Sequence, residues 1–119
     1  MYTWTREDFA HSVARAKMRG LSVEVVIDKS TAQRKPNPVT QALTKAKIPT
    51  LVYQGPGLLH HKFLYIDKQK LLSGSANWTK AAFTQNRESY ILLESLTEEQ
   101  IGIMEKLWQD LILESKRLE

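Results

Sequence analysis

The order of apolar and polar positions along the chain predicts alternating helices and strands. Phe9, Val13 and Ala16 recur at helical spacing, so we expect a helix over residues 6–19. The run over residues 23–28 is short and rich in β-branched side chains, which is typical of a buried strand. Further strands are expected over residues 50–53, 62–67, 71–75 and 90–94, between segments rich in polar residues, Gly or Pro.

Residue pairs typical of helix starts support this division. Thr5 with Asp8 and Thr97 with Gln100 resemble capping boxes, and Asn37 with Pro38 suits an N-cap and a first helical position. Helices are therefore expected over residues 39–47 and 97–115. The last one carries an apolar stripe, typical of a core-facing helix, made by Ile101, Met104, Leu107, Trp108 and Leu111. With no internal repeat, the alternation predicts an α/β fold in which helices flank a mixed β-sheet.

The composition is that of one globular domain. The chain has 119 residues, 42% of them hydrophobic and 25% charged, which suits one domain over residues 1–119. No apolar run approaches the roughly 20 residues that cross a bilayer, and the first residues lack the features of a signal peptide. The sequence as given therefore predicts a soluble chain. The absence of cysteine excludes disulfides, thiolate zinc sites and cysteine nucleophiles, and it leaves the compartment open.

The net charge is mildly positive. Lys and Arg number 17 and Asp and Glu number 13, which gives a formal charge of +4. This balance favours a polyanionic partner such as nucleic acid or an anionic lipid surface. The basic residues Lys29, Arg34 and Lys35 either line an entrance for a phosphate-bearing substrate or form an ordinary solvated loop.

Candidate chemistry is concentrated between residues 60 and 77. Residues two apart in a strand share a face, so His60 and Lys62 project together, whereas Asp67 has the opposite parity. The imidazole and the ammonium group can therefore act on one substrate, while Asp67 is better placed to support the scaffold. His61 faces away from Lys62, which favours a packing or hydrogen-bonding role for it.

A second pair of polar residues follows the next expected strand. Ser75 and Asn77 are also two apart, and Gly74 beside them permits the close approach of another group. An imidazole is a usable nucleophile near neutral pH, and ammonium, hydroxyl and amide donors bind phosphodiester oxygens as negative charge accumulates. These residue types are suited to attack on a phosphodiester. The scheme needs no metal ion, and no further cluster of metal ligands is visible in the sequence.

The full pattern resembles the signature of the phospholipase D superfamily: His60-x-Lys62, four residues, Asp67, six residues, Gly74-Ser75-x-Asn77. The likeness is to small members with one motif per chain, the bacterial nuclease-like and mitochondrial phospholipase-like branch. It implies a phospholipase D-like α/β fold and a metal-independent phosphodiesterase without a cofactor. In that scheme one histidine attacks phosphorus to form a phosphohistidine, a second histidine protonates the leaving oxygen, and water then reverses the roles.

The resemblance also implies a role for each residue of the site. His60 is the nucleophile or the acid, and Asp67 completes the motif. Lys62, Ser75 and Asn77 hold the phosphate. Glu88 resembles the acidic residue that orients the histidine, although without the resemblance an ordinary solvated charge beside Arg87 would be the favoured interpretation. Because the chain has one motif, the second histidine must come from a second copy, in a twofold homodimer that completes the active site.

The substrate class and the extent of the chain stay open. The positive charge favours nucleic acid, whereas the apolar run Gly57-Leu58-Leu59 ahead of His60 suits a phospholipid. Family members normally carry a helix and a strand ahead of the segment matching Tyr2–Thr5, so we expect the sequence to be a fragment. The missing elements support an alternative function, a truncated or decayed relative that binds phosphate-bearing ligands, or dimerises, without turnover.

Overall fold

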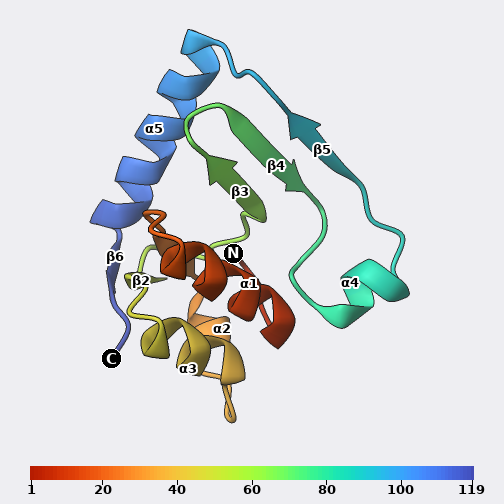
Figure 1. Ribbon diagram of the computed structural model, residues 1–119, viewed down its shortest axis with the longest axis vertical. Helices are drawn as coiled ribbons and strands as arrows, with labels where there is room; N and C mark the ends of the chain where they lie inside the picture. The colour runs from red at the N-terminus through yellow and green to blue at the C-terminus, as the bar shows by residue number, and fades with distance from the viewer.

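The strands form two separate three-stranded sheets (Figure 1). The computed structural model describes residues 1–119. The first sheet has the order β1-β2-β6, with β1 (Val25–Ile27), β2 (Thr50–Tyr53) and β6 (Ser115–Arg117). β1 runs parallel to β2, and β6 runs antiparallel to it. The second sheet is antiparallel, with the order β3 (Phe63–Ile66), β4 (Lys70–Gly74) and β5 (Tyr90–Leu93).

Five helices accompany the sheets: α1 (Glu7–Met18), α2 (Lys29–Ala32), α3 (Pro38–Lys45), α4 (Lys80–Thr84) and α5 (Glu98–Leu113). α1 packs against α3, and together with the first sheet these helices enclose the main core. α5 runs along the side of the molecule from the end of β5 to the start of β6 (Figure 1). The predicted α/β class, with mixed pairing and flanking helices, is confirmed. None of the helices is long and apolar enough to cross a membrane.

Two of the three expected helix starts are confirmed. The side chain of Asn37 accepts a hydrogen bond from the backbone of Thr40 at 3.2 Å, with Pro38 in the first turn of α3. Thr97 and Gln100 form the complete capping box of α5. These caps form because they use only residues of one helical turn.

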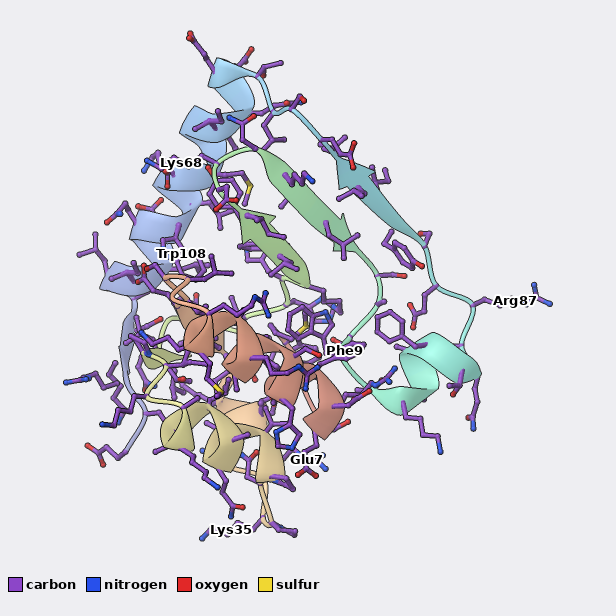
Figure 2. All side chains as sticks on the ribbon, viewed as in Figure 1. Glu7, Phe9, Lys35, Lys68, Arg87 and Trp108 are labelled. Atoms are coloured by element: carbon purple, nitrogen blue, oxygen red, sulfur yellow. The ribbon has the colours of Figure 1, made fainter.

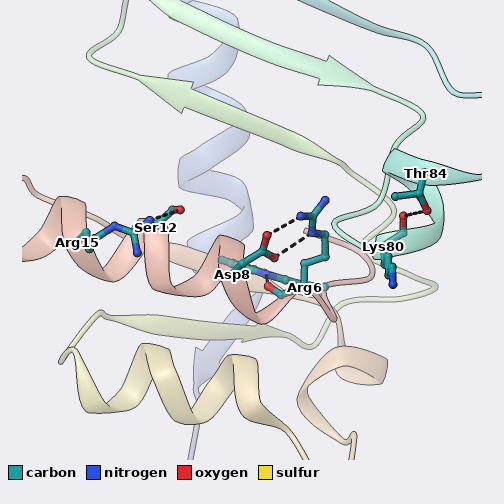
Figure 3. A network of polar contacts seen from close by, with 7 residues as sticks. Arg6, Asp8, Ser12, Arg15, Lys80 and Thr84 are labelled. Atoms are coloured by element: carbon teal, nitrogen blue, oxygen red, sulfur yellow. Dashed lines mark hydrogen bonds and ion pairs between the residues drawn. The ribbon is translucent and has the colours of Figure 1, made fainter.

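The expected capping box at Thr5 and Asp8 is wrong. α1 begins after Arg6, which offers no side-chain cap. The backbone N–H of Thr5 instead donates to the carbonyl of Trp78 at 2.9 Å, and Asp8 binds the guanidinium of Arg6, with 2.9 Å between Nε and Oδ1 (Figure 3). A distant partner for Thr5 and a neighbouring arginine for Asp8 have therefore replaced the expected cap.

Three short elements escaped the sequence prediction. α2 lies in a segment expected to be a loop, and the buried carboxylate of Asp28 caps it by accepting from Ser30 at 2.9 Å. α4 is capped by Thr79, whose hydroxyl accepts from Ala82 at 3.1 Å. β6 follows α5, which ends at Leu113 rather than at residue 115, because the chain there pairs with β2. Elements this short depend on tertiary contacts rather than on periodicity.

The first five residues connect the two sheets. Met1 accepts from the backbone of Asp28 at 3.3 Å, and Tyr2 donates to the carbonyl of His61 at 3.0 Å. Trp4, which is 1% exposed, forms a bridge with Trp78. The segment forms no regular strand, and this isolated bridge is its one β-type pairing.

A largely apolar cavity of about 350 Å³ opens beside this segment. Val25, Val26, Phe63 and Trp108 are among its lining residues, and they come from β1, β3 and α5. Figure 2 shows Trp108 on α5, where its ring lies 6.4 Å from that of Phe63. The two sheets are thus linked by packing and by the first segment, not by strand pairing.

Candidate active site

The antiparallel register of β3 and β4 gathers the predicted site residues at one end of the hairpin. Phe63 lies opposite Ser73, and Ile66 lies opposite Lys70. The chain therefore enters β3 and leaves β4 at the same end of the second sheet (Figure 1). Residues 60–62 precede β3 and residues 75–77 follow β4, so the two halves of the motif meet there.

His60 and Lys62 project side by side, as their spacing predicts. Nζ of Lys62 lies 3.0 Å from Nδ1 and 3.3 Å from Nε2 of His60. It also donates to the carbonyl oxygen of His60 at 3.0 Å. The side chain of His60 is exposed, so a substrate can reach it from solvent. Imidazole and ammonium are close enough to contact the same phosphoryl group.

Two opposing effects act on the ammonium group of Lys62. Burial lowers its pKa below the ordinary value, and the charge of Glu88 raises it in part. Glu88 thus acts on this cation through space although no ion pair joins them. The positive charge of Lys62 is suited to binding an anion such as a phosphate at this end of the hairpin.

Ser75 forms the centre of a hydrogen-bond network with Glu88. Its hydroxyl donates to Oε1 of Glu88 at 2.7 Å and accepts from the backbone N–H of Ser89 at 3.0 Å. The other carboxylate oxygen of Glu88 accepts from Asn86 at 3.3 Å. Gly74 makes this approach possible, since a Cβ there would collide with the backbone of residues 89 and 90. The sequence prediction that Gly74 permits close approach is confirmed.

Asn77 is oriented by the first segment of the chain. Its Oδ1 accepts a hydrogen bond from the backbone N–H of Thr3 at 3.3 Å. The Nδ2 group has no hydrogen-bond partner within the protein, so it can donate to a ligand. An amide donor, a hydroxyl and an ammonium group therefore border the same end of the hairpin as the imidazole.

The structure separates Asp67 from the other motif residues. It lies directly after β3, in the tight turn at the opposite end of the hairpin, with φ of 55°. Its side chain is exposed and makes no hydrogen bond or ion pair within the protein. A direct part in the chemistry of His60 would require a contact that this position does not provide.

Glu88 does not contact the imidazole that it was expected to orient. Its carboxylate oxygens accept from Ser75 and Asn86, and no hydrogen bond joins it to His60. Its orienting role for His60 stays a prediction. In the structure Glu88 accepts a hydrogen bond from the hydroxyl of Ser75, and its charge acts on Lys62.

Sequence reasoning missed two residues that shape the site. Asp28 is 2% exposed, and its Oδ1 accepts from the backbone of Leu59 at 2.8 Å, which fixes the chain just ahead of His60. Burial raises its pKa, but hydrogen bonds from Ser30, Leu59 and the backbone of Lys29 outweigh this, and the pKa lies below its ordinary value. An acid at a strand end followed by Lys-Ser-Thr is an N-cap signal that could have revealed it. The second missed residue is Tyr2, whose ring centre lies 4.5 Å from that of His60. No pattern in the neighbouring sequence indicated this contact.

The neighbouring aromatic residues lie where packing predicts. Trp78, which directly follows Asn77, packs against the main core, with its ring 4.5 Å from that of Trp4 and 5.7 Å from that of Phe9. His61 contacts Phe63 at 5.8 Å between ring centres. No group of three or more His, Asp or Glu side chains is arranged to hold a metal ion.

This geometry accords with the similarity of the chain to known proteins. Residues 1–111 match the family described as "Cardiolipin synthase, PLD-like domain". The chain belongs to this PLD-like family. The resemblance to the phospholipase D superfamily that the motif carries is thereby confirmed.

Curated relatives in this family are longer proteins. A phospholipase D of Rickettsia typhi is 37% identical over 83 residues, which are 70% of this chain and 40% of that protein. The mitochondrial cardiolipin hydrolase of Homo sapiens is 30% identical over 113 residues, which are 92% of this chain and 44% of that protein. The chain thus spans about two fifths of the length of the curated relatives it matches.

Two solved structures share the fold of this PLD-like chain. Nuc from Salmonella typhimurium, a phospholipase D family member, superposes with a TM-score of 0.88 at 24% identity, over 98% of this chain and 76% of that one. NucT from Helicobacter pylori gives a TM-score of 0.82 at 22% identity, over 98% of this chain and 78% of that one. At these identities the likeness concerns the fold.

Proposed function

We propose that the chain is a phosphodiesterase whose nucleophile is His60. The observation that carries the proposal is the contact between the His60 imidazole and the Lys62 ammonium, 3.0 Å apart, beside Ser75 and Asn77 at one end of the hairpin. The imidazole supplies a nucleophile, and the ammonium and amide groups supply two donors for phosphoryl oxygens. The Ser75 hydroxyl becomes a third donor when it turns from Glu88 to a phosphoryl oxygen. Membership of the PLD-like family supports the same reaction class.

The proposed reaction proceeds in two displacements. A ring nitrogen of His60 forms a bond to phosphorus while the bond from phosphorus to the leaving oxygen breaks, and a second imidazole gives that oxygen its proton. Water then attacks the phosphorus of the phosphohistidine and gives a proton to the second imidazole. This attack breaks the nitrogen–phosphorus bond and restores both imidazoles. Lys62, Ser75 and Asn77 bind the non-bridging oxygens, and no metal ion takes part.

The second imidazole is proposed to come from a second copy of the chain. The motif occurs once in the sequence, and a twofold dimer presents the same surface twice. β5, which continues from Glu88, exposes a run of apolar residues beside the site, with Ile91 66% and Leu92 54% exposed. Burying this run between two copies would stabilise a dimer and face the two sites toward each other.

Nucleic acid and phospholipid are the two proposed substrate classes. The formal charge of +4 favours nucleic acid. Leu58, which is 59% exposed just ahead of His60, offers a small apolar contact for a lipid. Turnover of single-stranded DNA, RNA, cardiolipin and phosphatidylcholine by one preparation, with and without EDTA, compares these substrates and tests metal independence together.

The nucleophile is tested by His60→Ala. We expect at least about a thousandfold loss of turnover on the best of these substrates, with unchanged far-ultraviolet circular dichroism. His11→Ala is the matched control, since His11 is an exposed histidine of α1 that contacts only Glu7. A His60→Ala protein as active as the His11→Ala protein would exclude His60 as the nucleophile.

The shared site is tested by mixing wild-type and His60→Ala chains under conditions that exchange subunits. If one site needs an imidazole from each copy, an equimolar mixture retains about a quarter of the activity, because only wild-type pairs work. Independent sites would retain about a half instead.

A folded, dimeric wild-type protein without turnover on any substrate would favour the alternative function, that of a decayed relative that only binds phosphate-bearing ligands.

A further inference from the structure

Tyr2 lies against both members of the proposed nucleophile pair. The ring centres of Tyr2 and His60 are 4.5 Å apart with an interplanar angle of 46°, and Nζ of Lys62 lies 5.2 Å from the centre of the Tyr2 ring. We propose that Tyr2 is a positioning residue that holds His60 and Lys62 beside each other for phosphate binding and attack. The inference builds on the proposed function and assigns the ring a task within it.

The two catalytic side chains need such support because little else holds them. Residues 60–62 lie ahead of β3 and belong to no strand. The ring of His60 is exposed, and its only hydrogen-bonding side chain is that of Lys62. A lysine side chain loses considerable rotamer freedom when it is ordered, so an unsupported ammonium group would bind phosphate more weakly.

Tyr2 can provide this support because its own backbone is fixed on both sides. Its N–H donates to the carbonyl of His61 at 3.0 Å, and its carbonyl accepts from the hydroxyl of Thr31 at 2.8 Å. The next residue but one, Trp4, is 1% exposed in the main core. The ring therefore projects from a segment that is hydrogen-bonded on both sides toward the side chains of His60 and Lys62.

The chemistry of an aromatic ring suits both neighbours. The face of a phenol ring carries partial negative charge and attracts an ammonium group within about 6 Å of its centre. The same face packs against an imidazole, and it attracts that ring further when a proton gives it positive charge. Tyr2 can thus hold Lys62 in place without neutralising the charge that must bind phosphate.

The segment that carries Tyr2 also reaches the other half of the site. The N–H of Thr3 donates to Asn77 at 3.3 Å, and the carbonyl of Thr3 accepts from the backbone of Trp78 at 2.9 Å. One extended segment therefore contacts the residues that precede β3 and those that follow β4. Tyr2 positions the nucleophile pair, and Thr3 fixes the amide that faces the same phosphate.

The test compares Tyr2→Leu, which removes the ring, with Tyr2→Phe, which keeps it. Phe83→Leu is the matched control, because it removes an exposed ring that contacts Phe9 and Arg6. The dissociation constant for inorganic phosphate is measured by nuclear magnetic resonance, together with the ring-nitrogen shifts of His60. The parameters kcat and KM are measured on the best substrate.

We expect Tyr2→Leu to weaken phosphate binding about fivefold, with a corresponding fall in kcat and a change in the His60 ring signals. Tyr2→Phe and Phe83→Leu should stay within about twofold of the wild type. Wild-type phosphate affinity and ring signals in Tyr2→Leu would overturn the proposal. An equal loss in Tyr2→Phe would also overturn it, because the hydroxyl rather than the ring would then act.

A second comparison covers the case in which Tyr2→Leu does not fold. Pentafluorophenylalanine in place of Tyr2 keeps the shape of the Phe variant but removes the negative charge of the ring face. Weaker phosphate binding than in Tyr2→Phe supports the proposal, and equal binding overturns it. Phosphate affinity and ring signals do not require turnover, so they decide the role of Tyr2 even if the wild type proves inactive.

Discussion

The two sheets of this protein differ in what surrounds them. The first sheet lies in the main core, where Ile27 of β1 and Leu43 of α3 are both 0% exposed. The second sheet carries the candidate site, and every residue of β5 is exposed. In Figure 1, α1, α2 and α3 gather below the second sheet and leave much of it open. Stability therefore resides mainly in the first region, and chemistry is proposed for the second.

The contrast has a physical basis. Burying apolar side chains supplies most of the free energy of folding, so a region with a closed core can be rigid without help from its surface. Reactive groups must meet a substrate, so they are exposed and depend on a few contacts to hold their geometry. Here those contacts come from the first region, through Asp28 to Leu59 and through Thr3 to Asn77.

The largest effect that the comparison predicts is on folding. Leu43→Ala removes a fully buried side chain and should lower the free energy of unfolding by about 2–5 kcal/mol. Ile66→Ala is the control on β3 of the second sheet, where the side chain is 42% exposed, and it should cost about 1 kcal/mol. Chemical denaturation of both variants measures the difference. Equal losses would show that stability is not concentrated around the first sheet.

An intermediate effect is expected on activity with little change in stability. Ser75→Ala removes the hydroxyl that contacts Glu88 and is proposed to bind phosphate, so kcat/KM should fall by about a hundredfold. Ser12→Ala is the control, since the Ser12 hydroxyl accepts only from Arg15 on the surface of α1 (Figure 3). Steady-state kinetics and thermal melts are compared for both. A Ser75→Ala protein with full activity would remove this hydroxyl from the site.

The smallest effect concerns the dependence of stability on pH. Burial, with the charges of the amino terminus, Lys62 and His60, lowers the pKa of His61, so the unfolded state binds a proton more tightly than the folded one. The free energy of unfolding should therefore fall as the pH drops below about 6.5, the unfolded value. Because His61 lies at the surface, its share should be below about 1 kcal/mol.

The measurement compares the wild type with His61→Gln in denaturant titrations between neutral and mildly acidic pH. The variant should lose less stability on acidification than the wild type. The buried amino group of Met1, with its pKa lowered to about 5, acts in the same direction in both proteins and cancels in the comparison. A parallel pH dependence in the two proteins would show that His61 titrates alike in the folded and unfolded states.

Prediction from the sequence succeeded where the signal is local. The two-residue spacing of His60 and Lys62 places both groups on one side of an extended chain, and the structure brings them together. Asp67, which parity set on the other face, lies at the other end of the hairpin, a separation that parity did not predict. Long helices with local caps, such as α5, were also predicted within about two residues.

Other features could be found only from the folded chain. The sequence does not indicate that Thr5 pairs with Trp78, and the expected cap at Thr5 was therefore wrong. β6 was not predicted, because its pairing with β2 involves residues more than sixty positions away. Glu88 meets Ser75 rather than His60, since the register of β4 and β5 decides which side chains face each other.

The sequence by itself determined the family, the residue types of the site and the side on which His60 and Lys62 project, because these follow from spacing within a few residues. Tertiary structure alone decided that Tyr2 packs on this pair, that Thr3 holds Asn77 and that Asp28 fixes the approach to His60. Such contacts join segments far apart in the chain. They depend on strand register and core packing, which no local pattern encodes.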